Sequence, residues 1–160
     1  MLNINDADLI EDLIENNTTI YLGSEKAAMN ESYLNFYNIE YVLTALPAIE
    51  SRFPHFEEKG IIQVVIDSYD TPNFDMYSRL HEAADFIYHS TIKGHLLVHC
   101  AAGRSRSATC LMAYYIKYRG LSFDSAFAFI KKKRPIICPN IGFQHQLKIF
   151  EKEIKTKICH

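Results

Sequence analysis

The chain has 160 residues, 48% of them hydrophobic and 22% charged, with a formal net charge of −2. These values predict a single domain over residues 1–160 and give no reason to expect a nucleic-acid partner. No apolar run approaches the roughly 18 residues of a membrane span, and the first residues lack the basic and apolar blocks of a signal peptide.

The four cysteines stand at positions 100, 110, 138 and 159, without the spacing of a metal site or a disulfide framework. We therefore expect reduced thiols and an intracellular protein, cytoplasmic with a nuclear location also compatible. Cys110 falls in a helical pattern and Cys138 in an apolar stretch, so both are expected in the core. No metal and no cofactor is expected.

The first half of the chain predicts short elements. Residues 7–14 have apolar residues at helical spacing, with Asn5 or Asp6 as the cap, and predict a helix. Residues 18–22 and 39–43 predict strands. A helical segment is expected over residues 25–36, and residues 48–60 predict a loop with one helical turn.

The second half is more strongly patterned. Residues 61–66 form a nearly continuous β-branched run, which predicts a strand buried on both faces. A polar loop over residues 67–73 precedes a helix over residues 76–92. A fourth strand is expected at residues 95–98, and the helix that follows its loop should end at Gly120. Two more helices are expected, starting at Ser122 and at Asn140.

Strands that alternate with helices predict an α/β fold. We expect a central, mostly parallel sheet of about four to five strands flanked by helices. Ligands of such sheets bind outside the carboxyl ends of the strands. The loop that follows the strand at residues 95–98 is therefore the first candidate for a site.

That loop reads His99-Cys100-Ala101-Ala102-Gly103-Arg104-Ser105-Arg106-Ser107. The first N–H groups of a helix lack intrahelical partners and bind phosphate, and Gly103 lets the loop turn its amides inward. A helix N-terminus and a neighbouring Arg favour the thiolate form of cysteine, which makes Cys100 a candidate nucleophile. Arg106 offers a planar fork to two phosphate oxygens, and the Ser107 hydroxyl is placed to hydrogen-bond the sulfur.

This stretch resembles the His-Cys-x5-Arg-Ser/Thr signature of the cysteine-dependent protein tyrosine phosphatases. The residues that follow Cys100, at positions 101–107, resemble those of the small, atypical dual-specificity branch. The resemblance implies a protein tyrosine phosphatase-like fold and a phosphocysteine intermediate on Cys100. It also implies a supporting role for His99, which shapes the loop, and for Asn140, which caps a helix behind the site. The phosphate-binding residues that it implies are Cys100, Ala101, Ala102, Gly103, Arg104, Ser105 and Arg106.

A phosphate ester needs a proton donor for its leaving oxygen, and the loop after residues 61–66 is expected at the same sheet edge. That loop holds Asp67 and Asp70, and Asp75 lies at its far end. The residues alone do not choose between Asp67 and Asp70. The resemblance to the general-acid loop of dual-specificity phosphatases favours Asp70, with Asp67 as the rival. Arg104 is expected to be a solvated side chain.

The resemblance implies hydrolysis of phosphotyrosine and of phosphoserine or phosphothreonine in proteins, with phosphorylated proteins, protein kinases among them, as partners. One alternative is a catalytically silent module that binds phosphate. Another is a phosphatase for a phosphoinositide or an RNA 5′ end. Phosphoinositide phosphatases tend to carry lysines where this chain has Ala101 and Ala102, and no basic stripe extends beyond residues 131–134. The sequence carries no signal for an oligomeric state.

Overall fold

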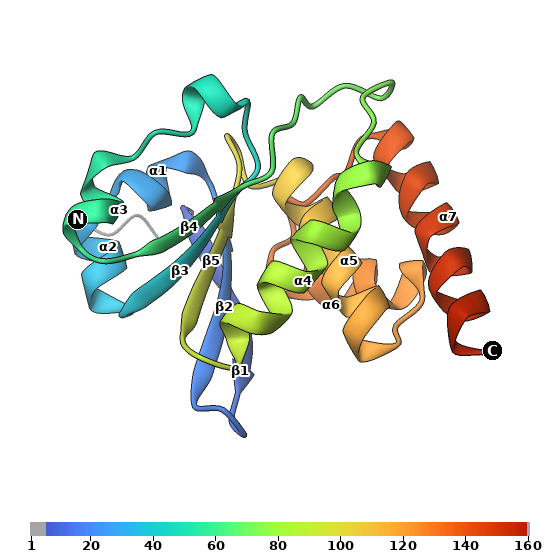
Figure 1. Cartoon of the computed structure of the whole chain (residues 1–160), viewed down its shortest axis with the longest axis horizontal. Coiled ribbons are helices and arrows are strands. Elements are labelled where there is room, and N and C mark those ends of the chain that lie inside the picture. The colour runs from blue at the N-terminus through green and yellow to red at the C-terminus, as the bar shows by residue number, and fades with distance from the viewer. Residues whose placement is uncertain (1–5, 160) are drawn as a thin grey trace.

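The computed structural model describes residues 6–159, which fold into a five-stranded sheet with helices on both faces (Figure 1). The strands lie in the order β1-β2-β5-β3-β4. Their bounds are Ala7–Leu13 (β1), Thr18–Gly23 (β2), Ile39–Thr44 (β3), Ile62–Val65 (β4) and His95–His99 (β5). β2, β5, β3 and β4 are parallel, and β1 runs antiparallel to β2. The predicted α/β fold with a mostly parallel sheet is confirmed.

The helix expected over residues 7–14 is wrong, because this segment forms strand β1. Its ladder with β2 begins at Ala7 and continues to Leu13. Ile10 is buried and its neighbour Leu9 is nearly half exposed, and the ladder shifts register between Leu9 and Glu11. Asn17 in the connecting turn has a φ of 54°, a left-handed conformation that asparagine tolerates. Pairing with β2 therefore outweighs the local helical spacing.

β4 differs from its prediction in burial. A strand is confirmed within residues 61–66, but the expected burial on both faces is wrong. β4 is the last strand in the sheet order and pairs with β3 on one side. Ile62 is 53% exposed, and the rest of the strand is half-buried. The β-branched run forms an edge strand.

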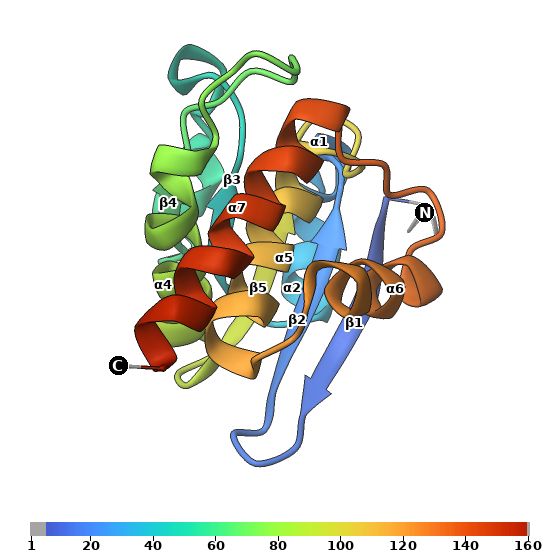
Figure 2. The same ribbon diagram turned by 90° about the vertical axis from the view of Figure 1, so that its right-hand side faces the viewer.

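The helices form two layers, with α1, α2 and α3 on one side of the sheet and α4, α5, α6 and α7 on the other (Figures 1 and 2). The helix expected over residues 25–36 is split in two at Asn30, and the helix expected over residues 76–92 begins with a 3₁₀ turn. No helix within residues 6–159 combines the length and the apolar character needed to cross a membrane. The bounds are Glu25–Met29 (α1), Glu31–Phe36 (α2), Ala48–Glu50 (η1, 3₁₀), Pro54–Glu58 (α3), Tyr77–Arg79 (η2, 3₁₀), Leu80–Thr91 (α4), Arg106–Arg119 (α5), Phe123–Lys133 (α6) and Ile141–Ile158 (α7).

The helix ends that depend on local chemistry match their predictions. α5 ends at Gly120, which has a φ of 66°. The side chains of Ser122 and Asn140 each accept a hydrogen bond from a backbone N–H in the first turn of α6 and of α7. Asn5, one of the two caps expected for the incorrect helix, lies outside the described residues, and Asp6 directly precedes β1.

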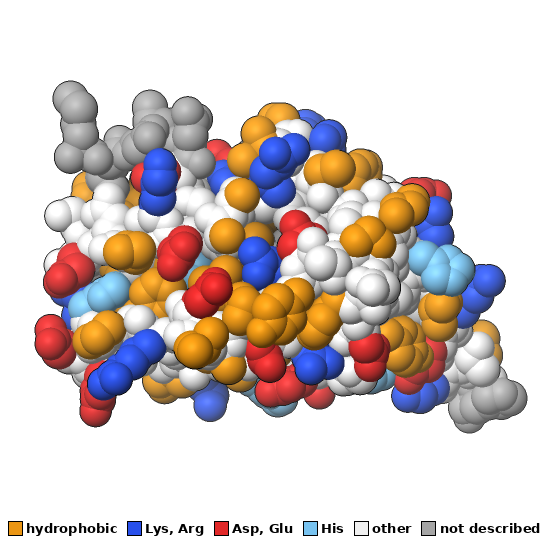
Figure 3. Space-filling view, turned by 90° about the horizontal axis from the view of Figure 1, so that it is seen from above, with side chains coloured by type: hydrophobic (Ala, Val, Ile, Leu, Met, Phe, Trp, Pro, Cys, Tyr) orange, Lys and Arg blue, Asp and Glu red, His pale blue; other side chains and the backbone are white. Residues whose placement is uncertain are grey.

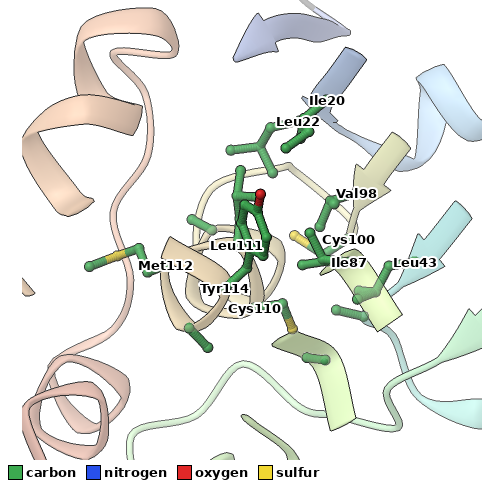
Figure 4. Close-up of a cluster of buried hydrophobic side chains, with 14 of the residues drawn as sticks. Ile20, Leu22, Leu43, Ile87, Val98, Cys100, Cys110, Leu111, Met112 and Tyr114 are labelled. Carbon is green, nitrogen blue, oxygen red and sulfur yellow. The ribbon is translucent and has the colours of Figure 1, made fainter. Parts of the chain in front are cut away.

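α5 is the central helix of the molecule: residues 107–116 are all buried, and the helix packs against the sheet and against α4, α6 and α7 (Figure 4). Val98 of β5 and Leu111 of α5 belong to this core and are fully buried. Cys100 lies beside them, at the point where β5 ends (Figure 4). The core therefore fixes both the strand that delivers Cys100 and the helix that follows it.

Candidate active site

The phosphate loop, defined here as residues 100–105, joins β5 to α5. Its peptide planes are oriented by donors outside the loop, because most of its carbonyls point outward and accept hydrogen bonds. Since a peptide plane carries its N–H opposite its C=O, this arrangement turns the loop amides inward, as an anion-binding nest requires. The carbonyl oxygens of Ala101 and Arg104 accept from backbone N–H groups, of Glu25 at 3.1 Å and of Cys138 at 2.7 Å. The carbonyl oxygens of Ala102 and Gly103 accept from the side chain of Arg134, from Nη2 at 3.3 Å and from Nε at 2.9 Å.

Gly103 is required at its position for two reasons. Its φ of 65° lies in the left-handed region, which strains any other residue. A Cβ at this position would also stand 2.5 Å from the carbonyl oxygen of Gly23, at the end of β2. The loop is therefore seated directly on the backbone of the sheet.

Cys100 lies at the base of the loop and is only 2% exposed. Its Sγ lies 3.0 Å from the hydroxyl oxygen of Ser107, a fully buried residue in the first turn of α5. A thiolate at this place accepts a hydrogen bond from that hydroxyl. The geometry expected for these two residues is present.

His99 supports the base of the loop from beneath. Its Nε2 lies 2.8 Å from the hydroxyl of Thr44, which accepts a hydrogen bond from Gln63 Nε2 at 2.7 Å. Its Nδ1 lies 3.3 Å from the carbonyl oxygen of Cys100, which only accepts, so Nδ1 carries the proton and Nε2 accepts from Thr44. Burial lowers the pKa of His99 to about 4 and keeps the ring neutral.

Arg106 lies at the mouth of the loop, and one of its donors is available for a ligand. Its Nη1 donates to the carbonyl oxygen of Ser68 at 3.2 Å. Its Nε is buried and has no hydrogen-bond partner within residues 6–159. A buried guanidinium donor without an acceptor fits a phosphate oxygen. The surrounding pocket has a volume of about 380 Å³ and is lined by Asp70, Cys100, Ala101, Ala102, Arg104, Ser105, Arg106 and Cys138.

Asp70 lies in this pocket, and Asp67 does not line it. Asp70 Oδ1 accepts hydrogen bonds from Ser105 Oγ at 2.6 Å and from Asn140 Nδ2 at 2.9 Å. Asp67 Oδ1 accepts instead from the backbone N–H of Ala48 at 2.9 Å and ties the start of its loop to η1. The structure thus brings Asp70 together with Cys100 and gives Asp67 a role in loop structure.

Figure 3 looks onto this end of the molecule, where charged side chains of both signs lie near the middle of the face and are bordered by hydrophobic ones. Arg104 is exposed, as expected, and its Nε donates to the carbonyl oxygen of Ile136 at 3.2 Å.

The prediction that Cys138 is a core residue is wrong, since it is exposed and lines the pocket. Cys110 is fully buried, as expected, and burial raises the pKa of its thiol.

Arg134 was missed as a site residue by the sequence analysis. It is 1% exposed and lies beneath the phosphate loop, where it holds the carbonyls of Ala102 and Gly103. Its Nη1 forms an ion pair with Asp8 of β1 at 2.7 Å. Three segments far apart in the chain meet at this one side chain. Its place in a run of four basic residues gave no sign of burial.

A larger hollow, of about 670 Å³, lies where β3 and β5 begin, away from the loop, and its lining, which includes Leu34, Lys59 and His95, holds no cysteine. No group of three or more His, Cys, Asp or Glu side chains in residues 6–159 is arranged to hold a metal ion. The pocket at Cys100 therefore remains the candidate active site.

Comparisons of the sequence and of the structure with known proteins point to the same family. Residues 20–153 match the model for the dual specificity phosphatase catalytic domain. Dual specificity protein phosphatase 1 of Arabidopsis thaliana is 38% identical over 150 residues, which cover 93% of this chain and 73% of that protein. The crystal structure of human DUSP28 superposes with a TM-score of 0.78 at 28% identity, covering 92% of this chain and 95% of that one.

Some relatives are much longer than this chain. MAP kinase phosphatase with leucine-rich repeats protein 2 of Dictyostelium discoideum is 37% identical over 135 residues, which cover 84% of this chain but only 19% of that protein. The shared part is the segment that carries the phosphate loop. On its sequence, its fold and the extent of these matches, the chain belongs to the dual specificity phosphatases, cysteine-dependent hydrolases that dephosphorylate proteins.

Proposed function

We propose that this chain hydrolyses phosphotyrosine and phosphoserine or phosphothreonine in proteins through a phosphocysteine intermediate on Cys100. Asp70 is the general acid and base, and Arg106 binds the transferred phosphoryl group. The observation that carries this proposal is the meeting of a buried thiol, a guanidinium with an unpartnered buried donor and a carboxylate in one pocket. The cradle of backbone amides and Arg106 supplies the positive charge that the reaction needs.

In the first step the Cys100 thiolate attacks phosphorus, and the bond from phosphorus to the ester oxygen breaks. Asp70 gives its proton to that oxygen, so that the group leaves as an alcohol or a phenol. Negative charge on the equatorial oxygens is stabilised by the loop amides and by the guanidinium of Arg106. The hydroxyl of Ser105, 2.6 Å from Asp70 Oδ1, holds the carboxyl group beside the loop.

In the second step Asp70 is a carboxylate and takes a proton from water as the water attacks the phosphocysteine. The bond from sulfur to phosphorus breaks, and the electron pair stays on the Cys100 sulfur. The Ser107 hydroxyl, 3.0 Å from that sulfur, stabilises the departing thiolate by a hydrogen bond. Inorganic phosphate then leaves and the enzyme is regenerated.

The proposed substrates are phosphorylated proteins, and phosphorylated protein kinases are the first group to examine. The Dictyostelium relative named above is called a MAP kinase phosphatase, which supports this choice. The Arabidopsis relative is called a dual specificity protein phosphatase, which supports action on both types of phosphoester. The similarity extends over nearly all of this chain, so the proposal concerns the catalytic domain that these relatives share.

The test is steady-state hydrolysis of phosphotyrosine and phosphothreonine peptides in EDTA, for the parent protein and for Cys100→Ser, Asp70→Asn and Asp67→Asn. We expect no turnover for Cys100→Ser and a loss of about 100-fold in kcat for Asp70→Asn. Asp67→Asn serves as the matched carboxylate control and should retain nearly parental rates, because Asp67 is engaged with Ala48.

The outcomes separate the alternatives. A parent protein that binds tungstate or phosphopeptide without turning it over would be a phosphate-binding module, and the enzymatic proposal would fail. Faster hydrolysis of a phosphoinositide or of an RNA 5′ triphosphate than of every phosphopeptide would move the substrate class away from proteins. Loss of activity in Asp67→Asn but not in Asp70→Asn would reverse the assignment of the acid.

A further inference from the structure

The loop that carries Asp70 is held along its length by α7, the last helix. We call residues 67–76 the acid loop; it passes over the N-terminal end of α7 (Figures 1 and 2). Asn140, which caps α7, donates from Nδ2 to Asp70 Oδ1 at 2.9 Å. Further along the loop, the backbone of Gly142 lies directly against the carbonyl group of Pro72. The contact therefore begins at Asp70 and continues away from the pocket.

The next contact is a pair of hydrogen bonds from one side chain. Gln146 donates from Nε2 to the carbonyl oxygen of Phe74 at 2.9 Å and accepts on Oε1 from the backbone N–H of Tyr77 at 2.6 Å. One amide group thus bridges the end of the acid loop and the start of η2. Because both bonds go to backbone atoms, they fix the path of the chain rather than the rotamer of a neighbour.

The end of this contact surface is anchored by Glu153. Its carboxylate accepts hydrogen bonds from the hydroxyl of Tyr77 and, at 2.9 Å, from His81 Nε2. Hydrogen bonds from Lys157 and Tyr77 lower the pKa of Glu153 to about 2, so it remains an anion. The ring of the buried Phe150 packs against His81, with centroids 4.9 Å apart. Residues at positions 142, 146, 150 and 153 lie on one face of a helix, so a single stripe of α7 makes all these contacts.

Gly142 is the most informative residue of the stripe. A Cβ at this position would stand 1.8 Å from the carbonyl oxygen of Pro72 and 2.5 Å from its carbonyl carbon. These are backbone atoms, so no side-chain rotation relieves the overlap and either the acid loop or α7 must shift. Alanine is the better helix former, so the substitution does not weaken α7 itself.

We propose that Gly142 and Gln146 are positioning residues for the general acid, and that α7 holds Asp70 at the pocket before substrate arrives. This inference rests on the proposed function, because it assumes that Asp70 donates the proton. Gln146 contacts the loop backbone, Gly142 contacts Pro72, and neither lines the pocket. A displacement of about 1 Å is enough to reduce the rate of an oriented reaction severely.

The test is the dependence of kcat/KM on the leaving group, since only poor leaving groups need a proton. Aryl phosphates from phenyl to dinitrophenyl are compared for the parent, Gly142→Ala, Gln146→Ala and Asp70→Asn. For phenyl phosphate we expect a loss of about 100-fold in Asp70→Asn and about 10-fold in the two α7 variants. For dinitrophenyl phosphate each of these variants should stay within about 2-fold of the parent.

Two controls keep the result specific. Lys152→Ala changes an exposed residue of α7 and should leave the leaving-group dependence unchanged. Tungstate affinity should be unchanged in Gly142→Ala and Gln146→Ala, because neither residue lines the pocket. A thermal melt at parental temperature for Gly142→Ala would show that the rate falls without unfolding.

The possible failures are distinguishable. If Asp70→Asn leaves the leaving-group dependence unchanged, the proposed function is wrong in its acid, and this inference falls with it. If Asp70→Asn steepens the dependence while Gly142→Ala and Gln146→Ala match the parent, the proposed function stands and the role of α7 is refuted. A uniform loss over all leaving groups in the α7 variants also refutes it, because general damage does not depend on the leaving group.

Discussion

Replacing Arg134 by methionine removes a buried guanidinium from beneath the phosphate loop and keeps an unbranched apolar side chain in place of the arginine's aliphatic stem. The replacement deletes the donors that hold the carbonyls of Gly103 and Ala102, and it removes the charge that pairs with Asp8. We expect the loop to lose both stability and order. Two quantities should therefore change together, the free energy of unfolding and the affinity for an oxyanion.

The size of the effect follows from the geometry of each bond. The carbonyl of Gly103 is buried and loses a 2.9 Å hydrogen bond, which costs about 1–3 kcal/mol when nothing replaces the donor. The 3.3 Å bond to Ala102 contributes less, because that residue is exposed and water can take over. The side chain of Asp8 is 31% exposed, so loss of its partner costs about 1 kcal/mol or less. The sum is about 3 kcal/mol.

The assay is urea unfolding together with tungstate binding, for Arg134→Met, Arg134→Lys and the neighbouring control Lys133→Met. We expect Arg134→Met to lose about 3 kcal/mol of unfolding free energy and about 10-fold in tungstate affinity. Arg134→Lys keeps the charge without the fork and should lose about half as much free energy. Lys133 is exposed, so its replacement should change neither quantity. Parental stability and tungstate affinity in Arg134→Met would refute this account of the loop.

Two further predictions concern residues beside the nucleophile. Ser107→Ala removes the hydrogen bond to the sulfur, so kcat should fall about 10-fold while kcat/KM stays near parental, and rapid mixing should show a burst of product. His99 is neutral in the fold, and its pKa is about 4 against 6.5 in the unfolded chain. The neutral His99 therefore contributes to the free energy of unfolding above pH 6.5. This contribution is lost as the pH falls toward 4, because His99 binds a proton more readily in the unfolded state. The parent should lose about 3 kcal/mol more than His99→Gln over that range, measured by urea unfolding.

Signals that act over a few residues predicted the structure well. Gly120, Ser122 and Asn140 end or begin helices as expected, because capping depends on a side chain and the backbone within one turn. The strand, loop and helix around Cys100 followed from hydrophobic patterning and from one motif. Much of the architecture was therefore accessible from the sequence.

The predictions that failed depended on distant partners. Residues 7–14 were expected to be helical because their spacing fits a helix, but pairing with β2 makes them a strand. Cys138 follows apolar residues, yet its backbone binds Arg104 at the rim of the pocket and leaves the thiol exposed. Arg134 looked like one more charge at a helix end, since only the fold brings it to Asp8 and Gly103.

The choice between Asp67 and Asp70 as the general acid also depends on contacts between distant residues. Asp67 and Asp70 lie in one polar loop, and both satisfy the requirement for a carboxyl group near the phosphate loop. The structure separates them through contacts made far along the chain: Asp70 with Ser105 and Asn140, and Asp67 with Ala48. Residue type identifies such candidates, but only tertiary contacts rank them.

The close stacking of backbones behind the phosphate loop has a consequence for how this enzyme can diversify. Gly103 lies on Gly23, and a Cβ on Gly23 would stand 2.6 Å from the carbonyl oxygen of Asp6, so three segments touch backbone to backbone. An evolving lineage cannot retune the anion cradle by small substitutions there, because each would displace main chain. New substrate preferences must instead arise at exposed residues next to the site, such as Tyr69, which precedes Asp70, and Ile136, whose carbonyl binds Arg104; they are 53% and 48% exposed. Substitutions can therefore change the substrate preference without changing the backbone that binds the phosphoryl group.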